Sequence, residues 1–224
     1  MKRLFTLLIA ATMTVVAMAQ EYDTPNPQTM GADEIMEEFR KDSAMEADAR
    51  GSNSTREKAV FVDETYPSGD RYVGYMRNGA SNGHGTYYWA DGSRYEGNFK
   101  NSDLEGYGIL YNPDNTKAYE GEFHKNAPHG EGTLYFSNGR KYVGEWKNGA
   151  ESGKGALYDA EDRVIYEGDW KEGKPNGKGS YYWKDGRKYV GDFRNGQSHG
   201  KGALYAADGA VIYEGEWLND KPAE

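Results

Sequence analysis

The 224-residue sequence contains no cysteine, which excludes disulfide bonds, thiolate metal sites, thiol catalysis and a lipoprotein anchor on cysteine. Apolar residues make up only 37% of the chain and the mean hydropathy is −0.95, which is too polar for a protein with many membrane spans. Proline is scarce, whereas glycine (30) and tyrosine (19) are abundant. The glycines follow no Gly-x-y period, so collagen is excluded. The net charge of −9 disfavours binding to nucleic acids and anionic bilayers.

Residues 1–19 have the three parts of a secretory signal peptide. Lys2 and Arg3 form a positive start, residues 4–16 are apolar, and Ala-Met-Ala at 17–19 is a typical cleavage site. The apolar stretch is too short to span a bilayer, which disfavours an uncleaved anchor. We therefore expect the mature protein to be exported to the periplasm, the cell envelope or the extracellular space.

Residues 20–58 differ from the rest of the chain because they are acidic and contain few glycines. Within them, apolar residues such as Ile35 and Phe39 are spaced as on one side of a helix over residues 33–49. Two interpretations stay open. The segment is either a solvated, disordered tether with a transient helix, or a short helix that lies on the domain that follows.

The remainder of the chain, residues 59–221, is an internal repeat. The motif Tyr-x-Gly recurs seven times at alternating spacings of 23 and 24 residues, and an aromatic residue usually follows two positions after its glycine. A Gly-x-Gly motif comes next, as at Gly153 and Gly155. The chain therefore contains a half unit, six full units and a truncated seventh.

Each unit is typical of a β-hairpin. Tyr-x-Gly-x-Trp alternates as a strand with one aromatic face, and Asn148-Gly149 is typical of a tight hairpin turn. Gly-x-Gly then begins a second strand, where glycine makes room for neighbouring rings. Short connections require antiparallel neighbours, so we expect an all-β fold, an elongated single-layer antiparallel sheet of tandem β-hairpins with about 14 strands.

The sequence resembles the membrane occupation and recognition nexus (MORN) repeat family over about residues 72–217, as in Tyr142-Val143-Gly144-Glu145-Trp146 followed by Gly153 and Gly155. The resemblance implies a twisted sheet used for docking, assembly or membrane association. Met76 and Ser102 depart from the motif. Alternate units carry one extra residue, which we expect in the links before Tyr119, Tyr166 and Tyr213, whereas the others carry Trp89, Phe136 or Trp183.

A single sheet layer has no second layer against which to bury its aromatic face, and such a face normally marks a binding surface. Each ring can either pack within the sheet or contact a partner. The cover can be the 33–49 segment, a second copy, a partner protein, a glycan or a lipid surface. The candidate binding residues are Tyr72, Tyr95, Phe99, Tyr119, Phe123, Tyr142, Trp146, Tyr166, Trp170, Tyr189, Phe193, Tyr213 and Trp217.

The sequence offers little catalytic chemistry. Residues 173–180 are one residue short of a phosphate-binding loop, and no histidine has a partner at metal-ligand spacing, so we expect no nucleotide, no metal and no cofactor. The acids recur with the repeat, whereas a catalytic pair is singular. In six units a basic residue follows Met76 or the aromatic residue, and in several of them an acid lies two positions away, as Asp169 does from Lys171. We expect these residues to form salt-paired ladders, and the alternative is a basic stripe suited to anionic headgroups: Arg77, Lys100, His124, Lys147, Lys171 and Arg194.

These observations favour a non-enzymatic exported scaffold that binds protein partners or a second copy of itself through its aromatic face. The alternatives are a repeat protein that binds cell-wall glycans, because exposed tyrosine and tryptophan rings stack on sugars, and one that associates with a membrane surface.

Overall fold

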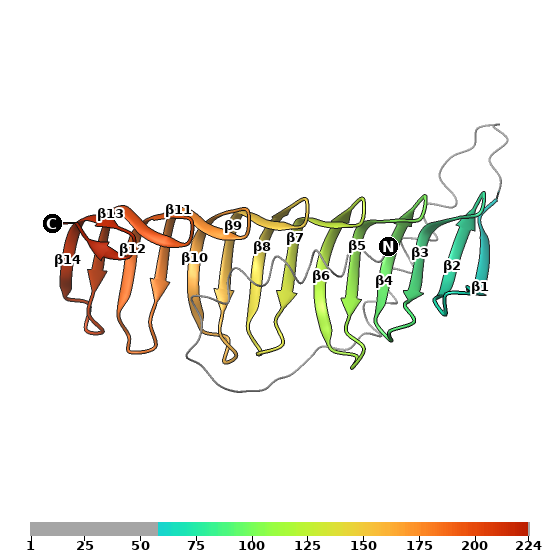
Figure 1. Ribbon diagram of the computed structural model, residues 1–224, viewed down its shortest axis with the longest axis horizontal. Helices are drawn as coiled ribbons and strands as arrows, with labels where there is room; N and C mark the ends of the chain where they lie inside the picture. Colours follow the sequence, from blue (N-terminus) through green and yellow to red (C-terminus); the bar gives the residue numbers. More distant parts are fainter. Residues whose placement is uncertain (1–57, 224) are drawn as a thin grey trace.

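A computed structural model describes residues 58–223, and the predicted signal peptide and the predicted 33–49 helix lie outside these residues. The described part contains fifteen strands and no helix (Figure 1). The strands are β1 (Val60–Thr65), β2 (Arg71–Arg77), β3 (Ala80–Tyr88), β4 (Arg94–Lys100), β5 (Asp103–Tyr111), β6 (Lys117–His124), β7 (Ala127–Tyr135), β8 (Lys141–Lys147), β9 (Ala150–Tyr158), β10 (Val164–Lys171), β11 (Lys174–Tyr182), β12 (Lys188–Arg194), β13 (Gln197–Tyr205), β14 (Val211–Leu218) and β15 (Lys221–Pro222).

The strands form one open sheet in which each strand pairs antiparallel with its neighbours in sequence, from β1 to β15. Figure 1 shows the resulting elongated single layer. At a spacing of about 4.8 Å per strand, the sheet is roughly 67 Å long. The predicted single-layer antiparallel sheet of tandem hairpins is confirmed, with one strand more than expected.

Each unit's hairpin closes with a two-residue turn in which both residues have positive φ, the signature of a type I′ turn. Asn148 (51°) and Gly149 (85°) form this turn between β8 and β9, as the sequence predicts. Ser102 stands where most units have glycine, and it also has a positive φ of 67°. Its side chain must therefore make an interaction that offsets the cost of this backbone conformation.

Hydrogen bonds between consecutive turns explain Ser102. The backbone N–H of Ser102 donates to the carbonyl of Ser81, the second residue of β3 in the preceding hairpin (2.9 Å), and the N–H of Ser81 donates in return to Ser102 Oγ (3.1 Å). Side-chain acceptors recur at two further turns, where Leu104 N donates to Asn126 Oδ1 (2.8 Å) and Ser198 N to Asp220 Oδ1 (2.7 Å).

At two turns the second residue is glycine, which has no side-chain acceptor, and the residue facing it in the preceding unit is a proline, which has no backbone N–H. Gly149 and Gly196 donate to the carbonyls of Pro128 and Pro175 (2.9 and 2.8 Å), and these prolines have no N–H that would need an acceptor. At these five turns the turn residue thus follows the hydrogen-bonding need of the preceding unit, whereas Gly173 donates to the carbonyl of Glu151 (3.1 Å), which is not a proline.

The link between units takes two forms. Some links begin with an aromatic residue, such as Trp89, whose N–H donates to the carbonyl of Ser93 (2.9 Å). In the other links the ladder skips one residue: Tyr158 pairs with Val164 and Leu157 with Tyr166, so that Ile165 is a β-bulge. Ala118 and Ile212 are skipped in the same way. The predicted position of the extra residue is confirmed.

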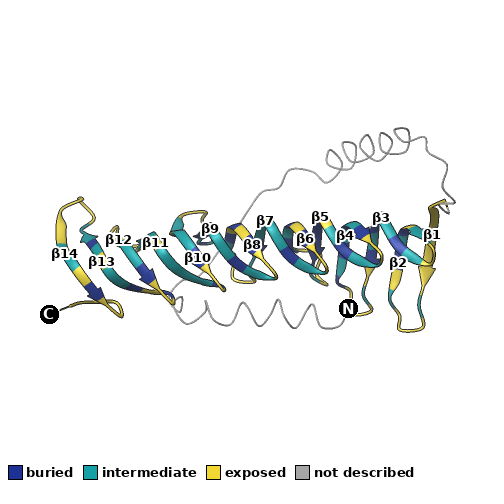
Figure 2. Ribbon diagram, turned by 90° about the horizontal axis from the view of Figure 1, so that it is seen from above, coloured by how far each residue is buried: buried dark blue, intermediate teal, exposed yellow. Residues whose placement is uncertain are grey.

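The core lies on one face of the layer, called here the inner face. The tyrosine and the aromatic residue of Tyr-x-Gly-x-Trp point to this face, and the residues between them point to the outer face. Figure 2 shows buried segments along the length of the sheet and exposed turns at its rims. A single layer of this length therefore contains a continuous core.

The substitution Asn126→Ala tests the bonds between turns. It leaves the N–H of Leu104, which is 1% exposed, without its acceptor, so we expect the free energy of unfolding to fall by about 1–2 kcal/mol. Denaturant unfolding followed by tryptophan fluorescence measures the change. Lys125→Ala, at the other positive-φ residue of the same turn, is the control and should change the free energy by less than about 0.5 kcal/mol. Equal losses for the two variants would contradict this account.

Candidate functional site

The aromatic residues singled out from the sequence form one continuous ladder on the inner face. Each Phe or Trp ring lies edge-on between the tyrosine of its own unit and that of the preceding unit. Trp146, for example, has its ring centre 5.3 Å from that of Tyr142 and 5.2 Å from that of Tyr119. Such edge contacts run without a break from Tyr72 to Tyr213. Aromatic pairs in this geometry stabilise a fold beyond the area that they bury.

Each repeat tyrosine is fixed at both ends. Its ring lies over a pair of glycines on adjacent strands: a Cβ added at Gly85 would lie 2.6 Å from Tyr72 Oη and 2.9 Å from a ring carbon. Its hydroxyl donates to the carbonyl three residues later, as Tyr142 does to Glu145 (3.0 Å). Burial raises the pKa of the Tyr142 hydroxyl, which stays protonated as this bond requires. The glycines of the repeat are thus explained by the volume of the ring.

This arrangement corrects the expectation that the aromatic face needs an external cover. Twelve of the thirteen candidate side chains are at most 7% exposed, and Tyr213 is half-buried. The rings cover one another, because each tyrosine lies along the strands over bare backbone. Packing within the sheet is the role that their placement supports, and direct contact with a partner stays a prediction.

The acids of the outer face form ion pairs across strands. Lys154 Nζ lies 2.5 Å from Asp169 Oδ1, and Lys178 Nζ lies 2.6 Å from Asp192 Oδ1. The hydrogen bond from Lys154, followed by that from the backbone N–H of Lys178 (2.8 Å), lowers the pKa of Asp169. These two acids are therefore partners of lysines on neighbouring strands.

The predicted partners of the cation column are wrong. Asp169 pairs with Lys154 on β9 and not with Lys171 two residues further on. His124 is the one member with an ion pair among the described residues, between its Nδ1 and Glu105 Oε1 (3.1 Å). Lys147, Lys171 and Arg194 form no ion pair with any described residue. At these three positions the column therefore has cations without an ion-pair partner, at the edge of the sheet formed by the hairpin turns, called here the hairpin rim.

A second set of cations stacks on tyrosines along the other rim of the outer face. The guanidinium of Arg94 lies 3.7 Å from the ring centre of Tyr111, and Lys141 Nζ lies 5.3 Å from that of Tyr158. These cations also have acidic neighbours, such as Glu96 beside Arg94 (2.6 Å). Their charge is used within the sheet, so this set supports the fold and offers little to a ligand.

Glu151 is a buried carboxylate that sequence reasoning missed. It is 1% exposed on the inner face opposite Trp146, and its Oε2 has no hydrogen-bond partner in the described part of the chain. Burial raises the pKa of this carboxyl to about 7 from its ordinary value of 4.5. The signal was available in the repeat alignment, where Ser, Leu or Pro stands at the same position of the other units.

The described residues contain no group of three or more His, Asp or Glu side chains placed to hold a metal ion. Residues 173–180, which superficially resemble a phosphate loop, form a turn and part of β11. No helix in the described range is both long and apolar enough to cross a membrane. The candidate binding features that remain among the described residues are therefore the exposed rows of the outer face and the edges of the sheet.

The outer face carries a row that was not singled out from the sequence. It consists of the middle residue of each Tyr-x-Gly and the residues paired with it. Val143 and Val190 are both 38% exposed in this row, at a position where four other units have glutamate. The row runs Val73, Thr86, Glu96, Ile109, Glu120, Thr133, Val143, Ala156, Glu167, Ser180, Val190, Ala203, Glu214.

Comparison with known proteins agrees with this geometry. A family model described as the MORN repeat matches residues 72–94, 95–117, 119–139, 142–160, 166–186, 189–211 and 213–223, together more than half of the chain. No curated protein matches the sequence. Among solved structures, a mutant of the TCP10 domain of Danio rerio CPAP is similar, with 17% identity and a TM-score of 0.40 over 69% of this chain and 71% of that one. Similarity at this level carries no functional argument.

The substitution Gly85→Ala tests the packing of tyrosine over glycine. Its methyl group would overlap the buried ring of Tyr72, so we expect the free energy of unfolding to fall by about 3 kcal/mol. Gly83→Ala is the control, because a Cβ there meets nothing within 4 Å and only the positive φ of 82° opposes it. We expect that control to cost about 1 kcal/mol in denaturant unfolding. A loss for Gly85→Ala no larger than that for Gly83→Ala would show that the ring does not need the bare backbone.

The substitution Glu151→Gln tests the buried carboxylate. Because the folded-state pKa of about 7 lies above 4.5, the wild-type protein loses stability as pH rises from 4.5 through 7. The variant has no such loss. Its free energy of unfolding should therefore equal that of the wild type at pH 4 and exceed it by about 2–3 kcal/mol at pH 8. Unfolding at several pH values measures the difference.

The matched control for this experiment is Glu214→Gln, at an exposed glutamate of the outer face. Its free energy of unfolding, measured at the same pH values, gives the effect of removing a glutamate carboxylate that is not buried. Stability curves for the wild type and Glu151→Gln that stay parallel from pH 4 to 8 would refute the buried, ionisable role of Glu151.

Proposed function

The chain belongs to the MORN repeat family, and on that premise we propose that it is an exported, non-enzymatic scaffold that binds a protein partner along the outer face of its sheet. MORN repeat proteins generally mediate binding or membrane association and are generally not catalysts. The proposed setting outside the cytoplasm rests on the signal-like residues 1–19.

The observation that carries the proposal is the exposure of Val143 and Val190 on a sheet whose core is complete without them. Glutamate occupies their position in other units, for example Glu120 and Glu167, so the fold does not require an apolar residue there. Val143 pairs with Ala156, and Val190 with Ala203, which gives two small apolar patches on the outer face. Exposed apolar patches that a fold does not need are typical of interaction sites.

The surroundings of these patches define the partner. Glu120, Glu167 and Glu214 flank the two patches in the same row. A partner with apolar side chains flanked by Lys or Arg complements this pattern. The patches lie four strands apart, about 19 Å, so an extended partner contacts both. Two copies of this acidic row would repel each other, which favours a different protein over a second copy.

A glycan is the second candidate ligand, and partly exposed aromatic residues in alternate links favour it. Trp183 is 36% exposed, and Phe136 and Trp89 occupy the corresponding positions two and four units earlier. Rings in such positions can stack on sugars. The next link has Ala206 at this position, so the fold also tolerates a small residue there.

The double variant Val143→Glu, Val190→Glu tests the proposal. It copies residues that other units already carry, so the protein should unfold at the same denaturant concentration as the wild type. We expect it to bind the partner captured by the wild-type chain from host envelope extracts at least tenfold more weakly. The matched control is Lys184→Glu, a change in an exposed link residue, which should leave capture unchanged.

Two further results decide between a protein partner on the outer row and a glycan. Undiminished capture by the folded double variant would overturn docking on the outer row. Sedimentation with purified peptidoglycan that is lost in Trp183→Ala, without any protein captured, would replace the protein partner by a glycan.

A further inference from the structure

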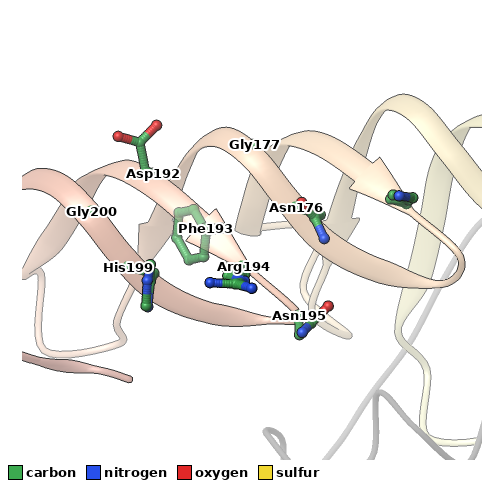
Figure 3. Close-up of a pocket in the computed structure, with 9 residues that line it drawn as sticks. Asn176, Gly177, Asp192, Phe193, Arg194, Asn195, His199 and Gly200 are labelled. Carbon is green, nitrogen blue, oxygen red and sulfur yellow. The ribbon is translucent and has the colours of Figure 1, made fainter. Parts of the chain in front are cut away.

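We propose that the hairpin rim of units five and six contains a binding site for a doubly charged oxyanion, of which a phosphate group is the type. An open depression lies there between the ends of β10 and β12 and the starts of β11 and β13 (Figure 3). Side chains from all four strands and from one turn line it. Those that can donate hydrogen bonds are Lys171, Asn176, Arg194, Asn195 and His199.

The donors of this site suit an oxyanion. Lys171 and Arg194 contribute two positive charges that no described carboxylate neutralises. The guanidinium of Arg194 presents paired N–H groups, which match two oxygens of one phosphate or sulfate group. The side-chain amides of Asn176 and Asn195 and the ring of His199 add further donors around them. A ligand with two negative charges and three or more oxygens would use this set most fully.

Asp192 is the one acid that lines the depression, and its charge is already used. Lys178 Nζ lies 2.6 Å from its Oδ1, and the backbone N–H of Lys201 donates to its Oδ2 (3.2 Å). Figure 3 shows its carboxylate pointing away from the side chains of Arg194, His199 and Asn176. It therefore does not compete with an incoming anion for the two free cations.

The repeat itself shows that this site is singular. The five corresponding positions elsewhere include an acid or lack a second strong cation. Between units one and two the last position is Glu105, and between units four and five the turn position is Glu172. Between units three and four His124 replaces one cation, and its Nδ1 is held by Glu105. A combination that occurs at one of six equivalent places is not a requirement of the fold.

The site does not depend on partner docking along the outer row. Its residues lie at the hairpin rim, whereas Val143 and Val190 lie within β8 and β12, in the row along the outer face. The chain as a whole is acidic, with a net charge of −9, so the local cations select an anionic group and do not attract polyanions in general.

The experiment uses the full chain and inorganic phosphate as the probe. NMR titration should show saturable shifts of the side-chain amides of Asn176 and Asn195 and of the His199 ring. Arg194→Gln should weaken binding at least tenfold, and Lys171→Gln should do the same. The matched control Lys147→Gln removes an unpaired cation at the same position of unit four and should leave the affinity unchanged.

Two results would overturn the proposal: no saturable shift with phosphate, or equal weakening by Lys147→Gln and Arg194→Gln. A second arm identifies the source of the group, using phosphatidylcholine vesicles with and without phosphatidic acid. Recruitment that needs phosphatidic acid and Arg194 assigns a lipid headgroup, and phosphate binding without recruitment assigns a soluble ligand. The variant Val143→Glu, Val190→Glu should bind phosphate normally, so failure of partner docking and failure of this site are distinguishable.

Discussion

The packing of a tyrosine ring over a pair of glycines is the interaction on which this structure depends. The ring of Tyr142 occupies the space that side chains at Gly144 and Gly155 would fill, and its hydroxyl is held by the carbonyl of Glu145. The next aromatic ring then closes the gap between one tyrosine and the next. A sheet without a second layer or a covering helix in its described part thereby acquires a core one ring thick.

Because the core is local, the residues that stabilise the fold are different from those exposed on its surfaces. Stability comes from contacts between neighbouring units, so residues that point outward are free to differ from unit to unit. Val143 and Glu167 occupy the same outer position in successive units and face the same kind of backbone. The hairpin rim shows similar freedom, because Glu105 and His124 contact each other there, whereas Lys171 and Arg194 form no ion pair with a described residue. Recognition can therefore vary along a scaffold that stays constant.

The repeat period predicted the hairpins, the type of turn at Asn148-Gly149 and the bulges before Tyr119 and Tyr166, because these features follow from local sequence. The cover of the aromatic face was not predicted. The strand glycines predicted room for rings over bare backbone, as the structure has it, but they did not predict that the rings also cover one another along the whole face. Ion pairs were misassigned for a similar reason, since the partner of Asp169 is across the sheet and not along the strand. The depression near Arg194 depends on four strands at once and leaves no linear motif.

The hydrogen bonds between consecutive turns restrict how such an array can gain or lose units. Deleting residues 142–188, a block of 47, would place Gly196 after Pro128, which has no N–H to satisfy. Deleting residues 119–165, also 47 residues, would place Gly173 after Leu104, whose N–H would lose the acceptor that Asn126 supplies. Both cuts keep the period of the repeat, but only the first keeps adjoining units compatible. Recombination between repeats, in evolution or in protein engineering, is therefore limited by the residues at the turns as well as by the period.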